Sequence, residues 1–309
     1  MRHLFIQSNF NVIAMGNGIP VNPATNFVDF YGNNGLGNYN AMVVTLAHNF
    51  ADNFSLQGQY TWGKSMDEGS GPYYKDPYPY DTKAAYGRSD YDVQNAFKAF
   101  GMWQPVFFHS NGLLKKVLGE WSVSGIWNWH TGFPFTPIYN TTISPYYQGA
   151  GYGQLRPAEY LGGAGNKTSN SVFEGENGAP NPNYGGNATK YFLAPTYVAG
   201  PKFPDTAPVP TPGIHRNSLN GPHYNDLDGS LVKQFGLPKN KILGSDAIFE
   251  FRADIYNVFN QINVDGSSID TLVGAARPDG TVASYNPHFG VARGALGSRT
   301  VQLQARFSF

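Results

Sequence analysis

The end of the chain, from Ser298 to Phe309, alternates between apolar and polar side chains. The apolar residues occupy the odd positions: Val301, Leu303, Ala305, Phe307 and Phe309. Successive side chains of a β-strand point to opposite faces, so this pattern predicts a strand with one apolar and one polar face. A terminal aromatic residue is typical of a transmembrane β-barrel, in which outward-facing aromatics form a girdle at each membrane interface. We therefore expect the odd residues to face lipid and the even residues to face a lumen.

The composition favours the same class. Charged residues make up 14% of the chain, below the roughly 25% that is usual in soluble domains. The 37 glycines and 22 prolines separate short strands, as in an all-β sandwich or barrel. The 21 basic residues balance the 21 acidic ones, so no nucleic-acid partner is implied. Cysteine is absent, which excludes disulfide scaffolds and thiolate metal sites.

The sequence contains no apolar run long enough for a membrane-spanning helix. The apolar part of Met1–Ser8 is too short for a signal peptide. We therefore expect the chain to be a fragment whose secretion signal lies upstream.

Alternation along the chain predicts about seven or eight antiparallel strands. The segments expected to form them are Tyr39–Phe50, Phe54–Gly63, Ser89–Gln104, Trp121–Thr131, Asn225–Phe235 (the weakest), Ala247–Phe259 and Ser298–Phe309. The region before Gly37 is expected to be mostly loop, Gly112–Gly119 a helical turn, and residues 133–222 one long, poorly ordered outer loop.

Connection lengths support a barrel. The three connections expected at the outer end are Ser65–Arg88, Gly132–Tyr224 and Asn260–Gly297, and the three at the inner end are Ala51–Asn53, Pro105–Glu120 and Gly236–Asp246. All three outer connections are longer than all three inner ones. Outer-membrane barrels combine short periplasmic turns with long outer loops, whereas a sandwich has no reason to do so.

Aromatic residues near strand ends are the candidates for the lipid interface: Trp62, Trp103, Trp121, Trp129, Phe307 and Phe309. Trp121 and Trp129 would lie roughly 20 Å apart across a tilted strand, close to the apolar band of about 25 Å between two girdles. Lys64 and Lys233 also fall on the lipid side. Both are near strand ends, so we expect them to snorkel to the headgroups.

The residues expected to line the lumen are Glu250, Arg252, Asp254, Gln302, Gln304, Arg306, His130, Gln57 and Gln59. Two interpretations of Glu250, Arg252 and Asp254 are open: a patch that contacts a plug or a solute, or a charge ladder that keeps the lumen wet and the strand in register. We favour the ladder, and we interpret His130 as a polar lining residue rather than a ligand.

Aromatic side chains in the outer loops could contact a solute. The candidates are Tyr73, Tyr74, Tyr78, Tyr80, Tyr146 and Tyr147, with Tyr139 and Tyr152 in the same loops. They could stack on sugars or on an aromatic siderophore, or they could pack the loops together over the barrel mouth, which we favour.

Motifs for chemistry are lacking, so we expect neither an enzyme nor a cofactor. No Ser–His–Asp arrangement and no H-E-x-x-H spacing is present. The acidic residues Asp76, Asp81, Asp90 and Asp92 match no defined calcium loop. The glycines of Gly149–Gly153 follow no strand and are interpreted as turn composition rather than a phosphate loop.

Several segments together resemble a known family. They are Asn38–Ala41, Tyr60–Ser65, Arg88–Asp92, Gly119–Gly125, Thr131–Phe135, Arg216–Pro222, Phe251–Asn260 and the final strand. In this order they resemble the carboxyl-terminal barrel of TonB-dependent outer-membrane receptors, particularly the Oar-like group. The resemblance implies a bacterial outer-membrane location and energy-coupled import of a scarce solute through a large barrel, without chemistry on it.

The chain also departs from that family. It shows no amino-terminal plug and no energy-coupling box, and plugged transporters use about 22 strands, so it resembles the last third of a receptor, residues 1–309 forming part of one barrel domain. The implied partners are outer-membrane lipid, the TonB energy-transducing complex through the missing plug, the barrel assembly machinery through the last strand, and a small solute. Iron chelate, cobalamin, oligosaccharide and peptide all remain open as the solute.

Two other classes remain as alternatives. One is a small complete outer-membrane barrel of about eight strands that acts as an adhesin or structural protein, and the other is a secreted carbohydrate-binding β-sandwich; a hydrolytic enzyme is a more distant alternative. The barrel hypothesis predicts an open, curved sheet for the isolated chain. A self-enclosed interior containing Phe249, Phe251, Leu303 and Phe307 would contradict it.

Overall fold

The structure is a computed structural model in which part of the chain is described. The described residues are 4–8, 28–32, 35–49, 53–70, 82–106, 119–141, 155–157, 159–160, 192–193, 197–199, 208–210, 214–237, 247–277, 281–286, 289–290, 292 and 294–309. Within these residues no helix has the length and apolar character needed to cross a membrane.

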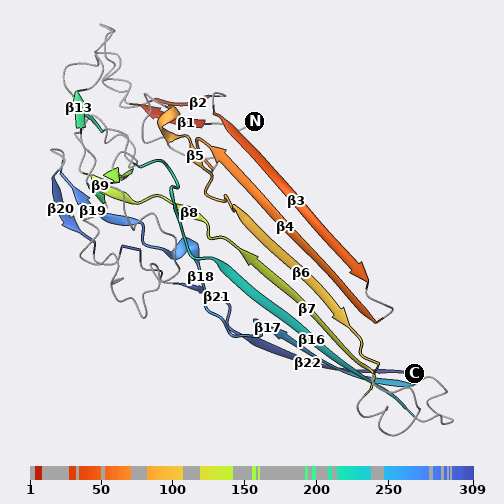
Figure 1. The fold of residues 1–309 in the computed structure, drawn as a ribbon. Coiled ribbons are helices and arrows are strands. Elements are labelled where there is room, and N and C mark those ends of the chain that lie inside the picture. The colour runs from red at the N-terminus through yellow and green to blue at the C-terminus, as the bar shows by residue number, and fades with distance from the viewer. Residues whose placement is uncertain are drawn as a thin grey trace.

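One antiparallel sheet of eight strands dominates the molecule (Figure 1). Its order is β22-β17-β16-β7-β6-β4-β3, and the short β5 pairs with the end of β4. The long strands are β3 (Gly37–Asn49), β4 (Phe54–Asp67), β6 (Asn95–Trp103), β7 (Trp121–His130), β16 (Tyr224–Gly236), β17 (Ile248–Tyr256) and β22 (Thr300–Ser308), and β5 is Gly87–Arg88. Strands that follow one another in sequence lie side by side, which is the all-β arrangement that the sequence predicts.

Three details differ from the sequence prediction. The strand expected from Ser89 begins only at Asn95, because residues 89–94 form turns tied to neighbouring polar groups. The strand β16, expected to be weak, runs over 13 residues. The region expected to be loop before Gly37 contains a hairpin of β1 (Leu4–Ser8) and β2 (Val28–Gly32). Most of the helical turn expected at Gly112–Gly119 lies outside the described residues.

Strand register divides the sheet into two chemically different faces. Phe235, Phe249 and Phe307 lie opposite one another on β16, β17 and β22, and Leu231, Ala253 and Leu303 form a second such row. The intervening positions are polar: Gln234, Glu250 and Arg306 form one row, and Ser230, Asp254 and Gln302 another. We call the first side the apolar face and the second the polar face.

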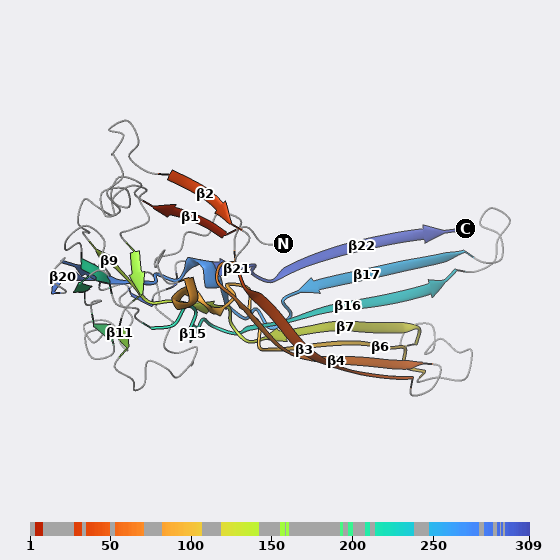
Figure 2. The same cartoon turned by 90° about the horizontal axis from the view of Figure 1, so that it is seen from above.

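The apolar face has no covering layer in the described part of the chain. Leu303 is 67% exposed, and Phe249, Phe251 and Phe307 are 37–44% exposed. The sheet stays open, with β3 and β22 as its edges (Figure 2). This confirms the open sheet and excludes the self-enclosed interior that would have contradicted a barrel.

The connections at the two ends of the sheet differ in length. At one end β3 is joined to β4, β6 to β7 and β16 to β17, and the chain terminus follows β22. At the other end, where β4 is joined to β6, β7 to β16 and β17 to β22, all three connections are longer. We call these the short-turn end and the long-connection end.

The long connections build a cap, which we define as the described residues of 67–94, 131–223 and 257–299. Its strands include β8 (Pro134–Phe135), β9 (Ile138–Thr141), β15 (Leu219–Asn220), β18 (Asn263–Val264), β19 (Leu272–Ala276), β20 (Val282–Tyr285) and β21 (Ala295–Leu296). The pairs β8–β15 and β9–β19 join segments that are far apart in sequence. The remaining pairs are β9 with β10 (Leu155–Pro157), β11 (Glu159–Tyr160) with β12 (Phe192–Leu193), and β13 (Tyr197–Ala199) with β14 (Pro208–Pro210).

A hydrophobic core lies inside the cap. Its buried residues are Phe135, Tyr139, Leu219, Ile269, Val273, Ala276 and Phe289. These residues come from the connection between β7 and β16 and from the connection between β17 and β22, so the core binds the two together. Residues 133–141 and 214–222 therefore form packed strands and turns, and the expectation of a structureless loop is wrong for these described parts.

Candidate functional site

The nine residues predicted to line a lumen all lie on the polar face. Glu250, Arg252 and Asp254 on β17 face Arg306, Gln304 and Gln302 on β22 in the same three rows. Gln57 and Gln59 lie on β4 and His130 on β7, with other strands between them and the β17–β22 rows. The nine residues thus share one side of the sheet but form no single cluster, and their lumen-lining role stays a prediction.

The charges of β17 are partnered within the sheet. The Arg252 Nε atom donates to both carboxylate oxygens of Asp254 at 2.9 Å. The Gln234 side-chain amide donates to Glu250 at 2.8 Å. An exposed ion pair of this kind contributes no more than about 1 kcal/mol to the free energy of folding. Because the partners of these charges come from the same sheet, the contacts favour the interpretation as a charge ladder that maintains strand register.

Other polar-face residues near the long-connection end were not singled out from the sequence. Lys98, Asn128 and Asp226 form one row across β6, β7 and β16. In the next row the His130 ring stacks on Tyr224, with centroids 5.1 Å apart and planes at 14°. The Tyr224 hydroxyl donates to Asp226 at 3.2 Å. Strict alternation within each strand was the signal that could have identified them.

The predicted interface aromatics lie on the apolar face. Trp103 lies at the short-turn end, where it is paired with Phe54 of β4. Phe307 lies at the same end, in the row that also contains Phe235 and Phe249. Trp62 and Trp129 lie toward the long-connection end, and Trp121 lies at the short-turn end beside Lys233. Phe309 follows β22 and its ring lies 5.6 Å from Phe307. Small residues separate these two groups, as in the row Gly101, Gly125 and Gly229.

The two lysines of the apolar face behave differently. Lys64 is exposed, as a snorkelling lysine would be. Lys233 is only 2% exposed, and its ammonium donates to the Gly119 carbonyl. The same ammonium lies 5.5 Å from the centre of the Trp121 ring and 4.9 Å from that of Phe235. The expectation that Lys233 snorkels is therefore wrong, because a carbonyl and two aromatic rings solvate its charge within the protein.

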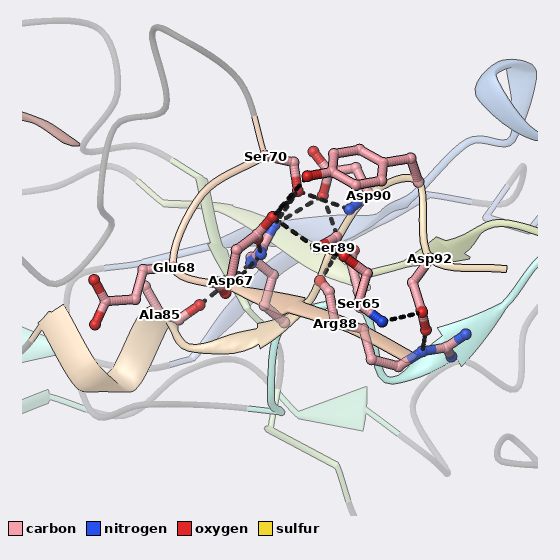
Figure 3. A network of polar contacts seen from close by, with 12 residues as sticks. Ser65, Asp67, Glu68, Ser70, Ala85, Arg88, Ser89, Asp90 and Asp92 are labelled. Atoms are coloured by element: carbon pink, nitrogen blue, oxygen red, sulfur yellow. Dashed lines mark hydrogen bonds and ion pairs between the residues drawn. The ribbon is translucent and has the colours of Figure 1, made fainter. Parts of the chain in front are cut away.

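A buried polar network joins two connections of the cap (Figure 3). The Arg216 guanidinium forms an ion pair with Asp67 and a second one with Asp90 at 2.9 Å. It also donates to the carbonyl oxygens of Asp67 and Ala85, at 2.8 and 3.2 Å, and to the Ser70 hydroxyl at 3.2 Å. The Arg216 and Asp67 side chains are 8% and 1% exposed, so Arg216 is a satisfied buried cation.

The neighbouring residues extend this network. The Asn217 side-chain amide donates to Asp90 at 2.6 Å and to the Arg88 carbonyl at 2.8 Å. Arg88 pairs with Asp92 at 2.7 Å. The network therefore brings together two of the segments that carried the family resemblance, Arg88–Asp92 and Arg216–Pro222.

Backbones approach closely at this joint. An added Cβ at Gly87 would lie 2.6 Å from the Arg216 carbonyl oxygen, so only glycine allows this contact. Asn217 has a φ of 58°, a left-handed conformation that asparagine tolerates better than most residues. Local sequence thus allows the two segments to meet, although nothing in the sequence shows that they do.

The carboxylates considered for calcium belong to this network. Asp90 accepts from Arg216 and Asn217, and Asp92 from Arg88 and the Ser65 backbone. Over the described residues no group of three or more potential metal ligands is present. Asp76, Asp81 and the Gly149–Gly153 stretch lie outside the described residues.

Of the loop tyrosines, Tyr139 is the one described, and its side chain is buried in the cap core. Burial, and secondarily the charge of Tyr285, raises the pKa of the Tyr139 phenol above its ordinary value. In the same cap, hydrogen bonds from the Ser267 hydroxyl and backbone hold the pKa of Asp265 below its ordinary value. Tyr139 therefore packs the loops, whereas Tyr73, Tyr74, Tyr78, Tyr80, Tyr146, Tyr147 and Tyr152 lie outside the described residues.

Comparison with protein-family models gives a match over nearly the whole chain. The model of a family described as outer membrane beta barrel domain matches residues 1–302. No curated protein and no solved structure matches the chain.

Proposed function

Because the chain belongs to the outer membrane beta barrel domain family and therefore lies in the bacterial outer membrane, we propose that it is part of a TonB-dependent receptor of the Oar-like group. In this proposal it contributes to the wall of a barrel that imports a scarce solute with energy from the inner membrane. The chain performs no chemistry on the solute. Its partners are the lipid around it, the TonB complex acting through a plug, and the assembly machinery acting on β22.

The observation that carries this proposal is the two-sided sheet. Across seven neighbouring strands, one face carries most of the large apolar side chains, and the other carries the amides, hydroxyls and most of the charges, together with the apolar residues Val43, Phe100, Met102 and Ile126. Lipid solvates the first face and a wet or plugged lumen the second, which is the alternation of outer-membrane barrels. A secreted sandwich would cover its apolar face with a second sheet.

Transport in particular rests on the resemblance and on the cap. The Arg216 network and the cap core join the long connections into one folded unit over the end of the sheet. Such a unit gives outer segments a fixed frame from which to contact a solute. The polar face bears both acids and bases as well as amides, so it does not single out one class of solute.

Uptake by the native bacterium tests the proposal. A strain that lacks the complete gene and a complemented strain would be supplied with labelled iron chelate, cobalamin, oligosaccharide and peptide. We expect the deletion to abolish uptake of one class, and a protonophore to abolish the same uptake in the complemented strain.

Two results would contradict it. Uptake that survives the protonophore would indicate a passive pore, and unchanged uptake of every class would exclude these transport roles. A deletion that instead removes attachment to surfaces or cells would support the adhesin alternative.

A further inference from the structure

A small apolar patch interrupts the polar face of the sheet. Phe100 on β6 lies directly opposite Ile126 on β7, and Met102 follows Phe100 on the same face of β6. All three side chains are exposed. The interior of an outer-membrane barrel is normally polar, and an exposed apolar patch rimmed by polar residues is typical of a binding surface. We call Phe100, Met102 and Ile126 the lumen patch.

Charges of opposite sign flank the lumen patch. Lys98 precedes Phe100 on the polar face of β6 and is exposed, and Asp226 lies in the same row two strands away on β16. Asp228 shares this face of β16 and lies opposite Ile126. Among the described residues, none of these three charges forms an ion pair. Neighbouring strands lie about 4.8 Å apart, so roughly 10 Å separates the backbones of Lys98 and Asp226.

The two aspartates create a demand for a cation. One carboxylate oxygen of Asp226 accepts the Tyr224 hydroxyl at 3.2 Å, and the other is buried with no hydrogen-bond donor in the described part of the chain. Asp228 accepts the Asn257 backbone N–H at 2.9 Å. Because the two carboxylates lie two positions apart on one face of a strand, their repulsion would be relieved by a positive group between them. Asn128 offers a side-chain amide in the row between Asp226 and Lys98.

This arrangement matches the chemistry of a short peptide. An extended tripeptide spans about 10 Å, at 3.3–3.6 Å per residue, which is the separation between Lys98 and Asp226. Its carboxylate would meet the Lys98 ammonium, its own ammonium would meet the aspartates, and its apolar side chain would cover the lumen patch. An uncharged oligosaccharide offers no group for either charge, and a fatty acid offers no ammonium.

The composition of the polar face does not single out a solute, but this arrangement does. We infer that the solute is a short zwitterionic peptide with an apolar side chain, and that Lys98, the two aspartates of β16 and the lumen patch bind it. The three strands β6, β7 and β16 that form this site lie side by side within the sheet (Figure 1). This inference rests on the proposed function, because it takes the polar face as the wall of a lumen that a solute enters.

Equilibrium dialysis with the full-length protein in phospholipid nanodiscs tests this inference. The probe is radiolabelled alanyl-leucyl-alanine. Alanyl-seryl-alanine lacks its apolar side chain, and alanyl-leucyl-alanine amide lacks its carboxylate. We expect saturable binding of the probe, with a Kd that is raised about tenfold for the seryl peptide and about fivefold for the amide.

Variants of the protein test which residue binds which group of the peptide. Lys98→Gln should raise the Kd of the probe about fivefold and leave the Kd of the amide unchanged, because the amide has no carboxylate for Lys98 to bind. Ile126→Ser should weaken binding of the probe but not of the seryl peptide. The matched control is Arg306→Gln, which removes another exposed cation from the polar face, on β22. It should bind the probe as tightly as the unmodified protein does.

Three results would overturn the inference: no saturable binding of the probe, equally tight binding of octanoate or maltotriose, or a Lys98→Gln effect that is as large for the amide as for the probe. The dialysis contains neither the TonB complex nor an energy source, so binding is measured whether or not uptake occurs. Uptake of another solute class together with failed peptide binding would overturn this inference alone. Peptide binding without any uptake would contradict transport and leave the binding site standing.

Discussion

The sheet and the cap use opposite rules for burying side chains. In the sheet, Leu46 and Leu303 are 71% and 67% exposed on the apolar face. In the cap, Tyr139 and Val273 are fully buried, and Phe289 nearly so. One chain therefore contains two kinds of region. The cap has an ordinary buried protein core, whereas the sheet exposes its apolar side chains on one face.

Polar groups follow the same division. The Arg252–Asp254 pair of the sheet is partly exposed on the polar face, with Arg252 at 45%, whereas the Arg216–Asp67 pair of the cap is buried. Water competes for the first pair, and the second is held in a low dielectric by several hydrogen bonds. The two regions therefore differ in where their charged pairs lie: partly exposed on the polar face of the sheet, and buried inside the cap.

The largest predicted effect comes from breaking the buried pair of the cap. Replacing Arg216 with alanine leaves the Asp67 carboxylate buried without its cation, which costs about 3–5 kcal/mol. We expect amide hydrogen exchange to speed up in the cap segments 67–70, 85–92 and 214–222. The strands β16, β17 and β22 should exchange as slowly as before.

The control for this change is Arg299→Ala, which removes an exposed arginine whose contact to the Val258 carbonyl is 3.4 Å long. The free energies of opening that hydrogen exchange gives for this variant should match those of the unmodified protein to within about 0.5 kcal/mol. If Arg216→Ala accelerated exchange equally in the sheet, the cap and the sheet would be one cooperative unit and the comparison would fail.

The second effect concerns the two faces of a single strand. Leu303→Arg places a charge on the apolar face, where it would cost about 2–4 kcal/mol at the middle of a bilayer. Gln302→Arg places the same charge on the polar face opposite Asp254, where we expect a cost below about 1 kcal/mol. Denaturant unfolding in phospholipid vesicles measures both. Equal costs would show that lipid does not solvate the apolar face.

The strands could be predicted from sequence because alternation is a local property. Each long strand carries its own period of two, so its existence and its faces follow without knowledge of its neighbours. The bounds are less secure, since the strand expected from Ser89 begins only at Asn95. The cap has no such period. Its strands β8 and β15 have two residues each, and the Arg216–Asp90 contact joins residues 126 positions apart.

The incorrect expectation for Lys233 has the same origin. Its place near a strand end could be read from the sequence, and snorkelling followed from that place. The Gly119 carbonyl that binds its ammonium belongs to a separate connection. Only the pairing of β7 with β16 brings the two together, so sequence identified the residue but not its partner.

The smallest predicted effect separates these two lysines of the apolar face. Lys233→Met keeps the length of the side chain but removes the donor to the Gly119 carbonyl and the cation beside Trp121 and Phe235. An unsatisfied carbonyl costs about 1–3 kcal/mol, and the gain from an apolar side chain offsets part of it, so we expect a net loss of about 1–2 kcal/mol. Lys64→Met removes an exposed charge and should change stability by less than about 0.5 kcal/mol.

Unfolding in the same vesicles measures both changes. A stabilising Lys233→Met would show that burial of this charge costs more than its contacts return, and equal effects would show that the two lysines share one environment.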